Sequence, residues 1–219
     1  MHRSAIAVLA SGRGSNLKSI LEATKDPAYP AEVRLVLSDV ADAPALGAAR
    51  AAGIDALTID PERKGPRLSN RAETSILSAL DEHRIRCLVL AGFMRILPAA
   101  LVAEWEGRML NIHPSLLPKY RGLHTYRRVL QAGERWHGST VHFVIPELDA
   151  GPAIVQYRVE IRPDDSEQTL MQRVQEGEYR IYPMAIGWIA AGRVSLEGGK
   201  VVKDGAELIE PVLINECEQ

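Results

Sequence analysis

The sequence predicts an α/β fold with a mostly parallel, twisted sheet, helices on both of its faces and an antiparallel C-terminal extension. Short apolar runs alternate with amphipathic helical patterns through the first two thirds of the chain. This alternation is typical of βαβ units and parallel sheets. After residue 137 the pattern changes to two longer strands, one long helix and a hairpin. The 219 residues suit a single domain over 1–219.

The first elements follow from apolar runs and from the periodic stretches between them. Residues 5–10 and 33–37 are apolar runs of strand length, separated by an amphipathic helical stretch at 15–23. An alanine-rich helix over 43–52 ends before Gly53, a residue favoured just after a helix. A third strand over 54–59 then precedes a charged loop with two prolines.

The next elements are predicted with the same criteria. Residues 70–83 indicate a helix because their apolar side chains fall on one face. Residues 87–91 are nearly all apolar, as expected of a strand that is covered on both faces. A short helix over 98–105 opens with proline, and residues 109–112 form another buried strand.

The last third is expected to contain strands over 139–145 and 153–161, joined by a turn at 149–152. The helical pattern over 166–191 contains Pro183, which predicts a break or kink near Tyr182. Strands over 194–196 and 200–202 flank a hairpin signal at 197–199. Residues 207–213 fit either an edge strand or a loop.

Composition narrows the classes of function. A formal charge of −2 argues against a general nucleic-acid binder, and no stretch is long enough to cross a membrane. The two cysteines give no disulfide framework, because Cys87 lies in an apolar run and Cys217 in a polar tail. This usage indicates a reducing, cytoplasmic compartment.

A glycine-rich loop, Ser11-Gly12-Arg13-Gly14-Ser15-Asn16, follows the first strand and opens the first helix. Glycines let the backbone approach an anion, and a helix N-terminus presents free N–H groups. A tight turn capped by Ser15 explains the same pattern equally well. Leu17 occupies the third glycine position of a dinucleotide fingerprint and no P-loop is present, so a monophosphate is the better ligand. Arg71 is a candidate phosphate contact, although alone it fits a solvated side chain.

The stretch Asn111-Ile112-His113-Pro114 places an amide and an imidazole two residues apart where a strand ends, and Asp149 follows in a turn. An amide donor, a ring base and a carboxylate are the groups needed for acyl transfer. A lone histidine at a strand end is more often structural, but the flanking motifs favour a site.

Residues 91–97, Ala-Gly-Phe-Met-Arg-Ile-Leu, suit one wall of a pocket for a flat apolar ligand. For Met94 alone, core packing is the better interpretation. The loops after residues 10, 91 and 112 all follow expected parallel strands, whose carboxyl ends are where α/β sheets bind ligands.

These motifs resemble those of the folate-dependent phosphoribosylglycinamide formyltransferases. The matching segments occur in the family's order over roughly residues 6–193: GRGSN at 12–16, AGFMRIL at 91–97, NIHPSLLPKYRGLH at 111–124, HGSTVHFV at 137–144 and ELDAGP at 147–152. NIHPSLLP and ELDxGP are shared by all 10-formyltetrahydrofolate-using enzymes of this superfamily, while the glycine-rich loop points to the glycinamide ribonucleotide enzymes.

The resemblance implies a Rossmann-like formyltransferase fold and an enzyme of purine biosynthesis. It would transfer the formyl group of 10-formyltetrahydrofolate to the amine of glycinamide ribonucleotide, giving formylglycinamide ribonucleotide and tetrahydrofolate. Residues 1–112 would form the phosphate-binding half, and residues 113–219 the folate-binding and C-terminal half. The implied partners are these two small molecules, with no nucleic acid, no membrane and a possible homodimer.

The resemblance also implies roles for individual residues. Asn111 would stabilise the oxyanion, His113 would transfer a proton, and Asp149 would hold His113 and a water. The ribonucleotide would be bound through its phosphate and ribose by Gly14, Ser15, Asn16, Arg71 and Glu178. The folate would lie against Met94, Arg95, Ile96, Leu97, Ile145, Pro146 and Glu147. On sequence alone, Glu178 is an ordinary acid on a helix surface. The bond between Leu117 and Pro118 is expected to be cis, as in the family.

No metal site is expected. His137 and His142 are five residues apart on an expected strand, so alternation places them on opposite faces, and neither pairs with a cysteine. The placed dipoles of an oxyanion site suffice for attack of an amine on a formamide.

Two positions depart from the family's pattern. Pro146 stands where relatives often have an acid or another residue with an N–H. If that N–H contacts the pterin in relatives, the contact is missing here. Arg121 is a residue common at this position in methionyl-tRNA formyltransferases.

Four alternatives stay open. A methionyl-tRNA formyltransferase would carry a further C-terminal domain and basic patches. A formyltetrahydrofolate deformylase would have a regulatory domain before the first strand. A non-catalytic nucleotide- or folate-binding module would be favoured by loss of Asn111, His113 or Asp149. A nicotinamide-dependent dehydrogenase would need a ribose-binding acid, for which Asp39 is only a weak candidate.

Overall fold

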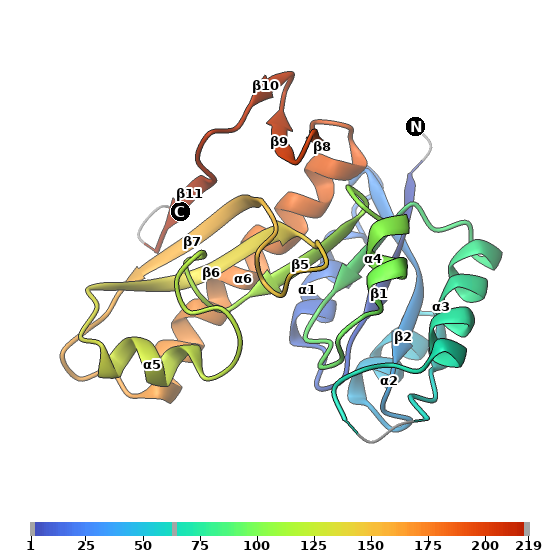
Figure 1. Cartoon of the computed structure of the whole chain (residues 1–219), viewed down its shortest axis with the longest axis horizontal. Helices are drawn as coiled ribbons and strands as arrows, with labels where there is room; N and C mark the ends of the chain where they lie inside the picture. Colours follow the sequence, from blue (N-terminus) through green and yellow to red (C-terminus); the bar gives the residue numbers. More distant parts are fainter. Residues whose placement is uncertain (1–2, 63–64, 217–219) are drawn as a thin grey trace. The chain divides into compact units, whose positions relative to one another are not determined.

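The computed structural model describes residues 3–62 and 65–216, so Cys217 lies outside the described part. The chain divides into two compact units, Met1–Leu110 (unit 1) and Asn111–Gln219 (unit 2). The boundary falls inside strand β5 (Met109–His113). Each unit is built around part of a sheet (Figure 1).

Unit 1 contains parallel strands in the order β4-β1-β2-β3. The strands are β1 (Ser4–Leu9), β2 (Ala31–Ser38), β3 (Asp55–Thr58) and β4 (Cys87–Leu90). The helices between and after them are α1 (Ser15–Ala23), α2 (Pro44–Ala51), α3 (Asn70–Glu82) and α4 (Ala99–Glu104). Because parallel crossovers are right-handed, α1 and α2 lie on one face, and α3, which returns the chain past β1, lies on the other. Figure 1 allows these elements to be followed by colour from blue to green.

The core of unit 1 is the set of apolar side chains predicted for its strands. Residues of β1 and β4 such as Ile6, Val8 and Leu88 are fully buried, as expected of strands covered on both faces. Strand β3 is short and mostly exposed, consistent with its place at the edge of the sheet. Helix α3 begins where Ser69 accepts a hydrogen bond from Ala72 N–H at 3.1 Å, an ordinary N-cap.

Unit 2 has strands in the order β11-β7-β6-β5. Strands β6 (Trp136–Phe143) and β7 (Ala153–Glu160) pair antiparallel, and β11 (Val212–Asn215) pairs parallel with β7. Helices α5 (Thr125–Gln131) and α6 (Glu167–Ala190) belong to this unit. A separate antiparallel sheet contains β8 (Val194–Glu197), β9 (Lys200–Lys203) and β10 (Ala206–Glu207). The predicted fold class is confirmed, including the antiparallel C-terminal extension.

Two details differ from the prediction, and a third had been left open. Helix α6 continues through Pro183 instead of breaking near Tyr182. Proline removes one helical hydrogen bond, but Ile181, Tyr182 and Ile186 on both sides of it are almost completely buried. Burial of the whole helix therefore outweighs the local defect. Helix α5 was not predicted, and the tail, left open as strand or loop, supplies both β10 and the edge strand β11.

Two expectations about single features are confirmed. The peptide bond between Leu117 and Pro118 is cis. Cys87 is buried, and its burial raises the pKa of the thiol to about 12, so it is not a reactive thiolate at neutral pH. Among the helices of the described residues, none has the length and apolar character needed to span a membrane.

Candidate active site

Strand β5 places Asn111 and His113 on the same face, because side chains two residues apart in a strand point the same way. His113 is buried and Asn111 is half-buried. The strand ends at His113, so the chain leaves the sheet directly after the imidazole. This geometry sets an amide and a ring nitrogen side by side at the end of a rigid element.

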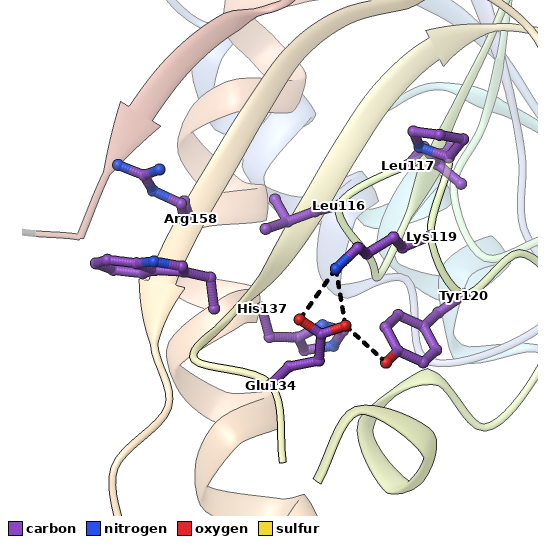
Figure 2. A pocket seen from close by; sticks show the side chains of 9 residues that line it. Leu116, Leu117, Lys119, Tyr120, Glu134, His137 and Arg158 are labelled. Atoms are coloured by element: carbon purple, nitrogen blue, oxygen red, sulfur yellow. Dashed lines mark hydrogen bonds and ion pairs between the residues drawn. The ribbon is translucent and has the colours of Figure 1, made fainter. Parts of the chain in front are cut away.

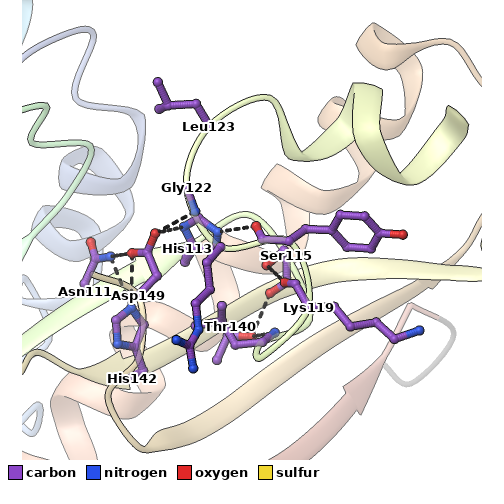
Figure 3. A network of polar contacts seen from close by, with 12 residues as sticks. Asn111, His113, Ser115, Lys119, Gly122, Leu123, Thr140, His142 and Asp149 are labelled. Atoms are coloured by element: carbon purple, nitrogen blue, oxygen red, sulfur yellow. Dashed lines mark hydrogen bonds and ion pairs between the residues drawn. The ribbon is translucent and has the colours of Figure 1, made fainter. Parts of the chain in front are cut away.

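Asp149 joins these two residues from the turn between β6 and β7. Its Oδ2 lies 3.4 Å from His113 Nδ1, and its Oδ1 lies 3.5 Å from Asn111 Nδ2. Gly122 N–H donates to Oδ2 at 3.0 Å. The carboxylate is only 8% exposed, and a buried charge needs such partners. The structure therefore brings together the three residues predicted for catalysis (Figure 3).

The turn that carries Asp149 is tightly constrained. Asp149 has φ 49, in the left-handed region, which non-glycine residues adopt rarely and often at functional sites. A Cβ on Gly151 would lie 1.8 Å from the carbonyl oxygen of Phe143. Only glycine allows this close approach, so the backbone of β6 directly supports the turn.

His142 is a member of this cluster that the sequence reasoning missed. Its Nδ1 lies 2.8 Å from the carbonyl oxygen of Phe143, and its Nε2 lies 3.2 Å from Asn111 Nδ2. Burial lowers the pKa of His142 to about 4, so the ring is neutral at pH 7. Since a carbonyl only accepts, the proton sits on Nδ1 and Nε2 accepts from Asn111. The sequence signal that could have identified His142 is its place inside an apolar strand, shortly before the turn that contains Asp149.

This assignment accounts for the amide hydrogens of Asn111. One is donated to His142 Nε2, which fixes the orientation of the amide. The other faces Asp149 Oδ1 at 3.5 Å, the outer limit of a hydrogen bond. One N–H of Asn111 therefore makes only a weak hydrogen bond, so it can donate to an oxyanion.

His113 has an acceptor at each ring nitrogen. Nε2 lies 3.0 Å from the carbonyl oxygen of Tyr120, and Nδ1 faces the carboxylate of Asp149. A neutral ring with its proton on Nε2 satisfies only Tyr120, whereas the protonated ring donates to both partners. Both ring nitrogens of His113 therefore face oxygen atoms that can accept a proton donor's hydrogen bond, and Nδ1 lies beside the carboxylate.

The loop after β5 is fastened to β6 and β7 by hydrogen bonds. Thr140 Oγ1 donates to Ser115 O at 2.7 Å and accepts from Leu117 N–H at 3.0 Å. Gln156 Nε2 donates to Leu117 O at 2.8 Å. These contacts hold the start of the segment that supplies the Tyr120 carbonyl to His113 and the Gly122 amide to Asp149 (Figure 3).

His137 and Glu178 both lie near Tyr126 in unit 2. His137 packs edge-on against Tyr126, with ring centroids 5.1 Å apart, and burial lowers its pKa to about 4. Glu178 in α6 is buried at 6% exposure, so it is not the surface acid that its sequence position suggested. Burial chiefly raises the pKa of Tyr126, and the charge of Glu178 adds to this.

A cavity of about 330 Å³ is present in unit 2 (Figure 2). Its polar wall is Lys119 Nζ, 2.8 Å from Glu134 Oε1, and Tyr120 Oη, which donates to the same carboxylate at 3.1 Å. The other lining residues are Leu116, Leu117, Pro118, Trp136, His137 and Arg158. No residue predicted for the site lines this cavity.

Of the folate-binding residues predicted in unit 2, Ile145 is half-buried and Pro146 is exposed. Glu147 is exposed and forms an ion pair with Arg121, Nη1 to Oε1 2.7 Å. The two family departures, Pro146 and Arg121, thus involve the turn that carries Asp149 and the loop that supplies Gly122.

In unit 1 the glycine-rich loop leads into α1 with Gly14 at the N-cap position and φ 71. A Cβ there would lie 3.0 Å from the Cβ of Ala45, so the position favours glycine for both conformation and space. Ser15 is the first helical residue, and Gly14 at the N-cap has no side chain that could cap the helix. The turn capped by Ser15 is therefore wrong, and the first amides of a nine-residue helix lack a side-chain cap.

Arg71 lies at the start of α3 with its side chain 84% exposed, 3.2 Å from Glu62 Oε1. Among the residues predicted as a folate wall, Met94 and Ile96 are exposed large apolar side chains, at 66% and 41%. Core packing of Met94 is therefore wrong. Leu97 is buried. Arg95 directs its guanidinium to Asp39, with Nε 2.6 Å from Oδ2.

The characteristic sequence pattern of the formyl transferases matches residues 4–186. The chain belongs to the formyl transferase family. It is 45% identical over 203 residues to the phosphoribosylglycinamide formyltransferase of Escherichia coli (strain K12), a match that covers 93% of this chain and 95% of that protein. The fold also matches the structure of a phosphoribosylglycinamide formyltransferase from Coxiella burnetii, with a TM-score of 0.91, 41% identity and coverage of 97% and 100%.

A formyltetrahydrofolate deformylase from Pseudomonas syringae shares the formyl transferase fold at a TM-score of 0.83, but with 25% identity. The match covers 92% of this chain and 66% of that one. The resemblance found in the sequence is confirmed, as is the assignment to formyl-transferring enzymes of purine biosynthesis.

Proposed function

We propose that this chain transfers the formyl group of 10-formyltetrahydrofolate to the amine of glycinamide ribonucleotide, giving formylglycinamide ribonucleotide and tetrahydrofolate. The observation that carries the proposal is the cluster of Asn111, His113 and Asp149 in a formyl transferase chain. Proteins named for the same reaction are similar to it over nearly their whole length.

The formyl carbon is attacked by the amine, and the carbonyl oxygen becomes an oxyanion. Asn111 uses its weakly committed N–H to stabilise that oxygen, while His142 holds the amide in place. Removal of one such donor from an oxyanion site costs on the order of 100- to 1000-fold in rate. His142 acts through Asn111 and is a positioning residue.

The proton of the attacking amine must leave as the new C–N bond forms. Asp149 is the base in reach, directly or through an ordered water, and protonated His113 stabilises the developing negative charge. The His113 proton is then available to the departing folate nitrogen. The carbonyl of Tyr120 and the amide of Gly122 hold the ring and the carboxylate in register for these transfers.

Substrate binding is assigned residue by residue. Gly14, Ser15 and Asn16 would hold the ribonucleotide phosphate through the start of α1. Arg71 adds a charge, and Glu178 contacts the ribose. Met94, Arg95, Ile96, Leu97, Ile145, Pro146 and Glu147 would contact the folate. Residues 1–219 act as one formyltransferase domain, with a phosphate-binding half at 1–112 and a folate-binding half at 113–219.

We also propose that the reaction uses no metal, because placed dipoles and a proton relay suffice for acyl transfer. A cytoplasmic location is supported by the buried, unpaired Cys87. The homodimer stays a proposal of the same kind.

A turnover assay tests the function. The chain is incubated with 10-formyltetrahydrofolate together with glycinamide ribonucleotide, with initiator methionyl-tRNA, or with neither acceptor. Tetrahydrofolate is expected only with the ribonucleotide. Equal turnover without an acceptor would identify a deformylase and overturn the proposal.

A further inference from the structure

A polar cluster centred on a buried carboxylate links three strand ends in unit 1. It contains Asp39, which directly follows β2, Ser11 after β1, and Met94 and Arg95 after β4. Because β1 pairs in parallel with both β2 and β4, the carboxyl ends of the three strands lie at one edge. All four residues belong to unit 1.

Asp39 is the centre of this cluster. Its Oδ1 accepts a hydrogen bond from Ser11 Oγ at 2.5 Å, and its Oδ2 accepts one from Arg95 Nε at 2.6 Å. Ser11 Oγ in turn accepts from Met94 N–H at 2.8 Å. The carboxylate is 4% exposed and the Arg95 side chain 19% exposed. Charge-assisted hydrogen bonds at these distances and burial are the strong class.

The cluster fixes the backbone of the segment from Met94 to Ile96. Ser11 Oγ holds the Met94 amide, Arg95 Nη1 donates to Gly65 O, and Ile96 N–H donates to Pro66 O at 2.6 Å. Met94 and Ile96 nonetheless leave their side chains exposed. Two large apolar side chains are thus exposed on a backbone that hydrogen bonds fix in place. Such an arrangement suits one wall of a binding site for a flat ligand.

We propose that Asp39 is a positioning residue that orients the wall from Met94 to Leu97 for the formyl donor and ties it to the start of the glycine-rich loop. This inference rests on the proposed function. Asp39 also binds the guanidinium of Arg95, which therefore stabilises the conformation of the wall. The wall then contacts the donor through its apolar side chains and its backbone.

Asp39→Asn tests this role, because it keeps the side-chain shape and removes the charge that binds Arg95. Steady-state kinetics should show KM for 10-formyltetrahydrofolate raised about 5- to 10-fold, with kcat within about twofold, because the wall is misplaced while the chemistry is intact. KM for glycinamide ribonucleotide should rise less, by about twofold. Wild-type turnover is measured first, so failure of the proposed function is seen separately.

Glu32→Gln is the matched control. Glu32 lies near the start of β2, the strand that Asp39 follows, and pairs with Arg34, Nη2 to Oε1 2.5 Å. It should leave both KM values unchanged. Ser11→Ala removes the hydrogen bonds of Ser11 Oγ to Asp39 and from Met94 N–H but leaves the pair of Asp39 and Arg95, and should raise the folate KM about threefold. If Asp39→Asn does not fold, the folate KM of Ser11→Ala tests the proposal. An unchanged folate KM in a folded Asp39→Asn or in Ser11→Ala would overturn the proposal, whatever happens to thermal stability.

Discussion

The polar groups of unit 2 and the loops of unit 1 are built on different principles. In unit 2, Asn111, His113 and Asp149 are at least half-buried, and each has two or more partners that fix its direction. In unit 1, Gly14 and Met94 offer backbone amides or an exposed apolar surface, and the charge of Arg71 is in solvent. Groups that transfer protons need defined orientation and low exposure, whereas groups that bind a solvated phosphate or a flat ring must be accessible.

The two groups of residues also differ in the free-energy cost of losing their partners. A buried carboxylate without its partners is costly, so the proposed catalytic cluster is also a network whose disruption affects folding. The proposed binding loops carry little such cost, with the exception of the Asp39 cluster. Substitutions of Asn111, His113 or Asp149 should therefore change kcat, and often stability, while substitutions in the unit 1 loops should change KM.

The largest effect is expected for Asp149→Asn. The amide retains an acceptor for Gly122 N–H but cannot take a proton, so kcat should fall by about 100- to 10,000-fold. Steady-state kinetics with both substrates, and a circular dichroism spectrum, measure the loss and the fold. Near-wild-type turnover would remove Asp149 from the mechanism.

Asp165→Asn controls for loss of a buried carboxylate in the same unit. Asp165 is 4% exposed and pairs with Arg173 at 3.0 Å. This variant should lose about 1–3 kcal/mol of unfolding free energy and keep its kcat. Equal loss of kcat in both variants would mean that burial, not position, explains the effect.

Stability should fall at acid pH through two histidines. Burial lowers the pKa of His137 and His142 from 6.5 to about 4. Between these values the unfolded chain binds protons that the folded chain does not, so their full contribution is present above pH 6.5 and is lost as pH falls towards 4. At pH 5 the loss is about 2 kcal/mol per histidine.

Urea unfolding at pH 7.5 and pH 5 measures this loss. In His137→Gln, the part of the pH dependence due to that ring should disappear, and the part due to His142 should stay. A wild-type unfolding free energy that is the same at both pH values would contradict the assignment of neutral buried rings.

A smaller effect is expected for Ser15→Asp at the start of α1. A carboxylate beside the phosphate should raise KM for the ribonucleotide by about 5- to 10-fold through repulsion of roughly 1 kcal/mol, with the folate KM unchanged. Ser19→Asp places the same charge about one turn further along α1 and should have less effect. If both substitutions act equally on the ribonucleotide KM, the effect is general charge and not the loop.

Much of the fold could be predicted from the sequence because the local sequence signals agree with the tertiary structure. The strands at β1, β4 and β5 are apolar runs that only a sheet covered on both faces can bury, and glycine or proline marks several of the turns. The prediction failed where packing opposed a local rule. Pro183 does not end α6, because its buried neighbours keep the helix continuous. Helix α5 has only seven residues and too short a pattern to be seen.

The sequence by itself determined the family and the α/β class, and it identified the three polar residues of the proposed site, because acyl transfer requires side chains of these types. Tertiary structure decided how those residues are held. The tautomer of His142, the acceptors around His113 and the Asp39 cluster all join residues that are remote in sequence or fixed by backbone carbonyls. Hydrogen-bond partners depend on distance and direction in space, and no spacing along the chain specifies either.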